Sequence, residues 1–205
     1  VGVEAHEVLV EARTGPGVPV PEIIGLPERS VRECKTRVRS ALHAIGRSFP
    51  KKNVVINLAP GDLRKGGSAP FDLVVALSVL ACLGDIQEEA LADTLVLGEL
   101  SLDGDVRGVR GVLPQLRSAM RRGLRGAIVP MENADEAAYA LGRELGDVGE
   151  GVFDVRVAST LEQVLLHLQQ VEALPAPEVS EARSVATQSV DMADVRGQGA
   201  ARRAM

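Results

Sequence analysis

Phe71-Asp-Leu-Val-Val-Ala-Leu-Ser-Val-Leu-Ala-Cys-Leu83 is apolar on every side of a helical wheel. A helix of this kind must be buried, so these residues are expected to form a helix in the middle of the fold. Strand-like and helix-like patterns alternate on both sides of it. Strands are expected at 1–12, 18–24, 52–58, 94–97, 126–129 and 152–157, and helices at 28–45, from 111 onward, at 133–141 and at 159–168. This alternation predicts an α/β fold or a mixed α+β sandwich.

The length and composition favour one packed domain followed by a tail. The chain has 205 residues, 45% of them hydrophobic, and a formal net charge of -5. No apolar run approaches the length that spans a bilayer, so a soluble protein in the cytoplasm is expected. We expect a domain over 1–171, a flexible linker over 172–190 and the start of a second, truncated module over 191–205. The absence of an initial methionine suggests a missing piece at the other end.

Cysteine and histidine give little support for a disulfide or a metal site. Cys34 and Cys82 fall on apolar faces of expected helices, where a thiol most often acts as a small core residue. His6, His43 and His167 have no acidic or thiol partner at the spacing of metal ligands.

Basic residues crowd the first third of the chain despite its net acidity. The tentative DNA contacts are Arg29, Arg32, Lys35 and Arg39 on one face of the helix at 28–45, followed by Arg47, Lys51, Lys52, Arg64 and Lys65. Such a face can contact phosphates, which are recognised by charge. A solvated helix surface explains the same pattern equally well. Aromatic residues make up only 2% of the chain, which argues against base stacking.

Two loops have sequences that suggest catalysis or nucleotide binding. Gly61-Asp-Leu-Arg-Lys-Gly-Gly-Ser68 nearly matches a phosphate-binding loop, but Gly67 stands where that loop needs its lysine. A tight turn is the better explanation, and the proximity of Lys65 to Ser68 is weak evidence for an activated serine. Asp103 and Asp105 flank Gly104 and are interpreted as turn residues.

Several blocks in fixed order resemble the ComM/YifB family of magnesium-chelatase-like AAA+ ATPases. The similarity extends over roughly residues 1–170. The blocks are Gly25–Leu42, Phe49-Pro50, Asn57–Lys65, Phe71–Leu73, Gly98–Gly104, Arg107–Pro114 and Val129–Ala137. The resemblance implies that this chain is the amino-terminal domain of a ring, with a homohexamer expected and no membrane partner. The implied activity is DNA branch migration during transformation and recombination.

That amino-terminal domain is in turn similar to the Lon protease domain. The similarity implies a ribosomal-protein-type two-layer fold with a mixed sheet. The catalytic serine and lysine of Lon-type enzymes fall at Pro70 and Leu113 in this chain. An alternative register would use Ser68, but Leu113 would still leave the pair without a lysine. No catalytic residue and no peptidase activity are therefore expected.

The tail resembles the segment that opens the family's ATPase module. The resemblance places Val195, Arg196, Gly197 and Gln198 beside the adenine of ATP. It implies ATP and Mg as cofactors of the full-length protein and none in this fragment, because the phosphate-binding loop is expected beyond Met205. The full-length protein is expected to be an ATPase and helicase. The alternative is a chelatase-like ATPase that remodels a protein or inserts a metal, with this domain as a partner adaptor.

Overall fold

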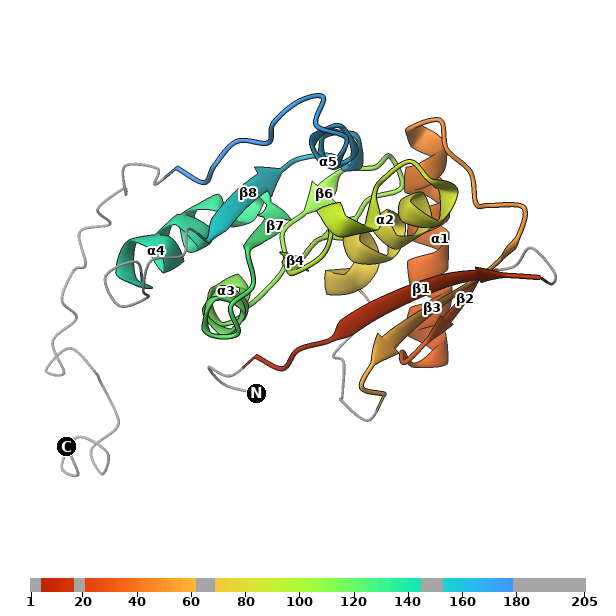
Figure 1. The fold of residues 1–205 in the computed structure, drawn as a ribbon, viewed down its shortest axis with the longest axis horizontal. Coiled ribbons are helices and arrows are strands. Elements are labelled where there is room, and N and C mark those ends of the chain that lie inside the picture. The colour runs from red at the N-terminus through yellow and green to blue at the C-terminus, as the bar shows by residue number, and fades with distance from the viewer. Residues whose placement is uncertain (1–4, 17–20, 62–68, 145–152, 179–205) are drawn as a thin grey trace, which may run out of the picture.

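The computed structural model describes residues 5–16, 21–61, 69–144 and 153–178 of the chain. Within these ranges the strands form two three-stranded sheets and a two-stranded ribbon, with helices packed around them. Figure 1 shows α1 and α2 packed beside one sheet, and α3 and α4 next to each other on one side of the other sheet. The mixed α/β class expected from the sequence is confirmed.

The first sheet has the order β1-β3-β2. Its strands are β1 (Leu9–Gly15), β2 (Pro21–Ile24) and β3 (Asn53–Ala59), and α1 (Glu28–Ala44) connects the parallel pair β2 and β3. β1 runs antiparallel to β3, so the two strands expected before α1 both pair with β3 and not with each other. Residues 5–8 precede β1 and are not in a strand, so the expected strand at 1–12 begins later than its pattern indicated.

The apolar stretch forms α2 (Asp72–Leu83) at the centre of the domain, as expected. A single 3-10 turn, η1 (Ala69–Phe71), leads into it, and Gly84 ends it in the left-handed conformation with φ of +83°. Leu73, Leu77 and Leu80 are completely buried in the main core. This core also contains the inward side chains of β3 and the apolar faces of α1 and α5.

The second sheet is parallel and has the order β4-β7-β8. It consists of β4 (Thr94–Val96), β7 (Gly126–Pro130) and β8 (Asp154–Ala158). The helices α3 (Val112–Arg121) and α4 (Ala134–Glu144) pack against it and bury a second apolar cluster. Short 3-10 turns, η2 (Glu88–Ala90) and η3 (Met131–Asn133), precede β4 and α4.

The ribbon pairs β5 (Glu99–Leu100) with β6 (Val106–Arg107) through the turn expected at Asp103 and Gly104. Its turn is fixed by Ser101, whose hydroxyl donates to the Asp105 carboxylate at 3.1 Å and accepts from the Asp105 N–H at 2.9 Å. Asp105 therefore has a role in the turn, as interpreted from the sequence.

The last helix, α5 (Leu161–Leu168), begins with a capping box formed by Thr160 and Gln163. The chain then returns to β8. Leu174 is buried, and its N–H donates to Nδ1 of His167 at 3.2 Å. The Pro175 carbonyl accepts from the Val157 N–H at 3.0 Å, so the packed structure includes the first residues of the segment predicted to be a linker. Among the described residues, no helix is long and apolar enough to cross a membrane.

Candidate functional site

The predicted basic face lies on α1, but ion pairs occupy part of it. Glu33 accepts from Nε of Arg29 at 2.9 Å, and Glu28 accepts from Nη1 of Arg32 at 2.9 Å. Each pair joins residues one helical turn apart and is exposed, so it contributes little to stability and can exchange for another anion.

The basic residues that follow α1 also include both a paired cation and cations without an ion pair among the described residues. Arg47, just after α1, contacts the Asp85 carboxylate at 3.0 Å. Lys51 and Lys52 are exposed, and Arg64 and Lys65 lie outside the described residues.

Four of the predicted cations make no ion pair within the described part of the chain. Lys35 and Arg39 lie one turn apart on α1, and the Arg39 guanidinium stands 5.7 Å from the centre of the Phe49 ring. This contact places the end of α1 beside the turn that carries Lys51 and Lys52. These four residues are called the basic patch: Lys35, Arg39, Lys51 and Lys52.

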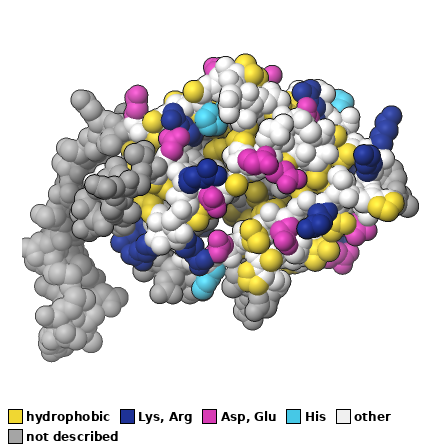
Figure 2. All heavy atoms as spheres, viewed as in Figure 1, with side chains coloured by type: hydrophobic (Ala, Val, Ile, Leu, Met, Phe, Trp, Pro, Cys, Tyr) yellow, Lys and Arg dark blue, Asp and Glu magenta, His cyan; other side chains and the backbone are white. Residues whose placement is uncertain are grey.

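The charge on the face of the molecule seen in Figure 2 is mixed. On the face shown in Figure 2, Lys and Arg side chains are interspersed with Asp and Glu. The protein therefore does not present a single basic field on this face, and any phosphate contact has to be local.

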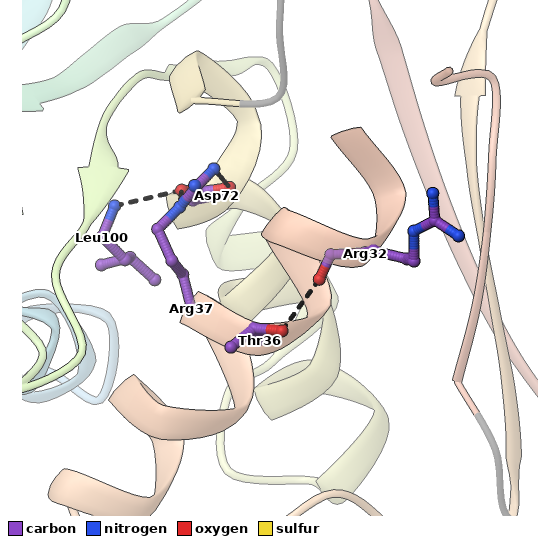
Figure 3. A network of polar contacts seen from close by, with 5 residues as sticks. All are labelled: Arg32, Thr36, Arg37, Asp72 and Leu100. Atoms are coloured by element: carbon purple, nitrogen blue, oxygen red, sulfur yellow. Dashed lines mark hydrogen bonds and ion pairs between the residues drawn. The ribbon is translucent and has the colours of Figure 1, made fainter. Parts of the chain in front are cut away.

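A buried ion pair that the sequence did not predict joins α1 to α2. Nε of Arg37 donates to Oδ2 of Asp72 at 2.5 Å, and Nη2 donates to Oδ1 at 3.1 Å. The Leu100 N–H also approaches Oδ2, at 3.4 Å. Figure 3 shows Arg37 turned toward Asp72, whereas Arg32 on the same helix points away from it. Since both oxygens accept from the guanidinium, the geometry requires an ionised carboxylate.

The surroundings of this pair shift the protonation equilibria of its members. Burial raises the pKa of the Asp72 carboxyl, while the Arg37 guanidinium, the Cys34 thiol and the Leu100 N–H oppose the rise. The hydrogen bond to Asp72 raises the pKa of Arg37. Burial, followed by the Asp72 charge, raises the pKa of the Cys34 thiol. Cys34 is fully buried, as expected for a core residue, and stays protonated.

Pro70 and Leu113, the positions expected from the sequence to correspond to a Lon-type catalytic pair, carry no reactive side chain. Pro70 lies in η1, where its carbonyl accepts from the Gly98 N–H at 3.3 Å. Leu113 lies in the first turn of α3 and packs against the second apolar cluster. The chain's lysines are Lys35, Lys51, Lys52 and Lys65, and none follows residue 65. Ser68 lies outside the described residues.

The loop between β6 and α3 is fixed by the segment that precedes α4. Oδ1 of Asn133 accepts from the Val109 N–H at 2.9 Å, and its Nδ2 donates to the Val109 carbonyl at 3.0 Å. Glu132 accepts from the Gly108 N–H at 2.9 Å, and Glu136 accepts from the Leu113 N–H at 2.7 Å. The Asn133 side chain thus bridges the start of the helix expected at 133–141 to this loop, a long-range contact that sequence spacing does not reveal.

Within the described ranges, His, Cys, Asp and Glu form no group of three or more that could hold a metal ion. The residues expected beside adenine, Val195 to Gln198, lie outside the described part.

Comparison with known proteins gives a consistent set of relatives. Residues 10–133 match the family described as subunit ChlI of Mg-chelatase. The chain is 36% identical over 205 residues to the uncharacterized protein YifB of Escherichia coli K12 and 34% identical over 209 residues to the competence protein ComM of Haemophilus influenzae. Both alignments cover 100% of this chain, which spans only 38% and 39% of those relatives. A Lon protease of Paraburkholderia phytofirmans is 27% identical over 137 residues, covering 63% of this chain and 16% of the protease.

Proposed function

Since the chain belongs to the magnesium-chelatase ChlI family, with ComM and YifB among its relatives, we propose that it is the amino-terminal accessory domain of a ring-forming AAA+ ATPase. The proposed ATPase migrates DNA branches during natural transformation and recombination in the cytoplasm. The observation that supports this proposal is the alignment of the whole chain with a competence protein. On this proposal the larger remainder of such a protein supplies ATP hydrolysis with Mg and the hexameric ring, and Val195–Gln198 of this chain contact the adenine.

The domain's own part in this proposal is non-catalytic. The proline and the leucine at the two Lon-type positions can neither attack a carbonyl nor accept a proton. Both residues instead take part in packing and backbone hydrogen bonds. The Arg37–Asp72 pair joins two helices, with the Asp72 side chain fully buried and the Arg37 side chain 21% exposed.

The basic patch is the proposed contact with DNA. Among the described residues its four side chains have no carboxylate to displace, whereas Arg29, Arg32 and Arg47 each have one. When the basic patch neutralises a phosphate, it therefore loses only bound water and counterions.

Neutralising the patch is expected to weaken DNA binding and its dependence on salt. In the full-length protein, the variant Lys35→Gln/Lys51→Gln/Lys52→Gln should lower the slope of log affinity against log salt by about 0.9 for each phosphate that the protein no longer neutralises. Fluorescence anisotropy with a labelled branched duplex, measured across a range of salt concentrations, gives this slope. None of the three lysines belongs to the buried core, so folding should be unaffected.

The matched control is Arg29→Gln/Arg32→Gln/Arg47→Gln, which removes three cations that are already paired with carboxylates. It should change the slope by less than the patch variant. A patch variant with the parental slope and affinity would show that this surface does not touch DNA.

The second candidate is a chelatase-like ATPase that remodels a protein or inserts a metal, with this domain as the partner adaptor. The match to the ChlI family favours it, because that family is named for a metal chelatase. The two candidates differ in what stimulates ATP hydrolysis by the complete protein.

A further inference from the structure

A groove of about 570 Å³ lies between β1 and β4, and α2 forms its floor. This volume is within the range of natural ligand sites. Figure 1 shows β1 passing beside α2, with β4 and β7 further along the same side of the molecule. One end is closed by α3, where Ser118 and Arg122 contact the segment that precedes β1.

The floor is a single stripe of α2. Phe71, Val74, Ser78, Ala81 and Cys82 all line the groove, and their spacing of three, four, three and one residues keeps them on one helix face. Four of the five are only half-buried, whereas the other sides of α2 are buried in the core. Although α2 is apolar all round, this one stripe is therefore only partly covered by the described chain.

The groove has an unpaired strand edge on each side. Within the described ranges β1 pairs only with β3, and β4 pairs only with β7. The Leu97 N–H donates to the Ile128 carbonyl of β7 at 3.0 Å. Because successive residues of a strand direct their N–H and C=O groups to opposite edges, those of Val96 face the groove. Such an edge is a template for another extended chain.

The charges along the groove indicate which kind of ligand can bind there. Its carboxylates outnumber its guanidinium groups: Glu7, Glu11, Glu88 and Asp93 against Arg13 and Arg122. Glu7 is paired with Arg122, and Asp93 with Arg125. Glu88 is exposed and has no ion pair among the described residues. The excess of negative charge disfavours nucleic acid here and favours a basic partner.

We propose that this groove binds an extended peptide segment of a partner protein, apolar at its centre and flanked by lysine or arginine. The segment pairs as an extra strand with the edges of β1 and β4, and every second side chain of it contacts the α2 stripe. Its flanking lysine or arginine residues contact the carboxylates along the groove. No hydrolysis follows, since Pro70 and Leu113 supply neither a nucleophile nor a base. This site lies on different residues from the basic patch and does not depend on the proposed role in DNA migration.

Cys82 provides a direct probe of occupancy. It lines the groove and is half-buried, whereas the chain's other cysteine, Cys34, is fully buried. The probe ligand is a short amidated peptide of alternating valine and threonine between lysine pairs. Added to the 205-residue chain, it should slow alkylation of Cys82 by iodoacetamide in a saturable way, and Cys82→Ala should remove the reaction. Peptide mass spectrometry assigns the alkylated residue.

Three controls test the proposal. The same peptide N-methylated at every valine and threonine cannot donate a backbone hydrogen bond from either edge and should not protect Cys82. Glu88→Lys should raise the peptide concentration for half-protection by about three- to fivefold, while its neighbour Glu89→Lys, outside the groove, should leave it unchanged. Absence of protection by the parent peptide, or equal protection by the N-methylated peptide, would overturn the proposal.

Discussion

Arg37→Met is expected to lower the free energy of unfolding by about 3 kcal/mol or more at neutral pH. The methionine fills similar space but leaves the Asp72 carboxylate completely buried without its counter-ion. Urea unfolding followed by circular dichroism measures the destabilisation. The double variant Arg37→Met/Asp72→Asn should recover most of it, because no buried charge remains. A single variant as stable as the parent would contradict the inferred role of the pair.

The destabilisation should also depend on pH with a definite sign. Burial already raises the pKa of Asp72, and removing Arg37 takes away the largest opposing influence. In the variant the folded carboxyl therefore binds its proton more tightly than the unfolded one. Stability must then fall as pH rises, so the variant should be closer to the parent at pH 5 than at pH 8.

Gly25→Ala is expected to cost about 3 kcal/mol or more. Gly25 adopts a φ of +93°, and a Cβ there would stand 2.2 Å from the Leu58 carbonyl oxygen of β3. Backbone of a central strand cannot move aside as a flexible side chain can, so the join between β2 and α1 must shift. Urea unfolding of the variant measures the change.

Gly46→Ala is the matched control. Gly46 also has a positive φ, +71°, but a Cβ there would meet nothing within 4 Å. Its destabilisation should be about 1–2 kcal/mol, which is the conformational cost alone. Equal destabilisation at the two glycines would show that the close approach to Leu58 contributes nothing.

The fold was predictable because its elements have strong local signals. The uniformly apolar stretch became α2, the period of the apolar residues placed α1, and Thr160 marked the start of α5. The pairing of strands was not predictable. The sequence of β1 does not indicate whether it pairs with β2 or with β3, because the pairing depends on the path of the chain between these strands.

The candidate site was only partly predictable. The sequence placed the basic residues on one helix face, but it could not show that Arg29, Arg32 and Arg47 are paired with carboxylates. The Arg37–Asp72 pair was missed because its members are 35 residues apart. No residue next to either of them in the sequence indicates an ion pair. The groove was missed for the same reason, since its walls come from four separated segments.

The most direct test of the proposed function is the ATPase rate of the complete protein with and without branched DNA. We expect strong stimulation by a four-way junction and weaker stimulation in Lys35→Gln/Lys51→Gln/Lys52→Gln, with the basal rate unchanged. An ATPase rate that does not change with branched DNA but rises when a protein partner is added would contradict the branch-migration proposal. It would support the second candidate, in which this domain is a partner adaptor.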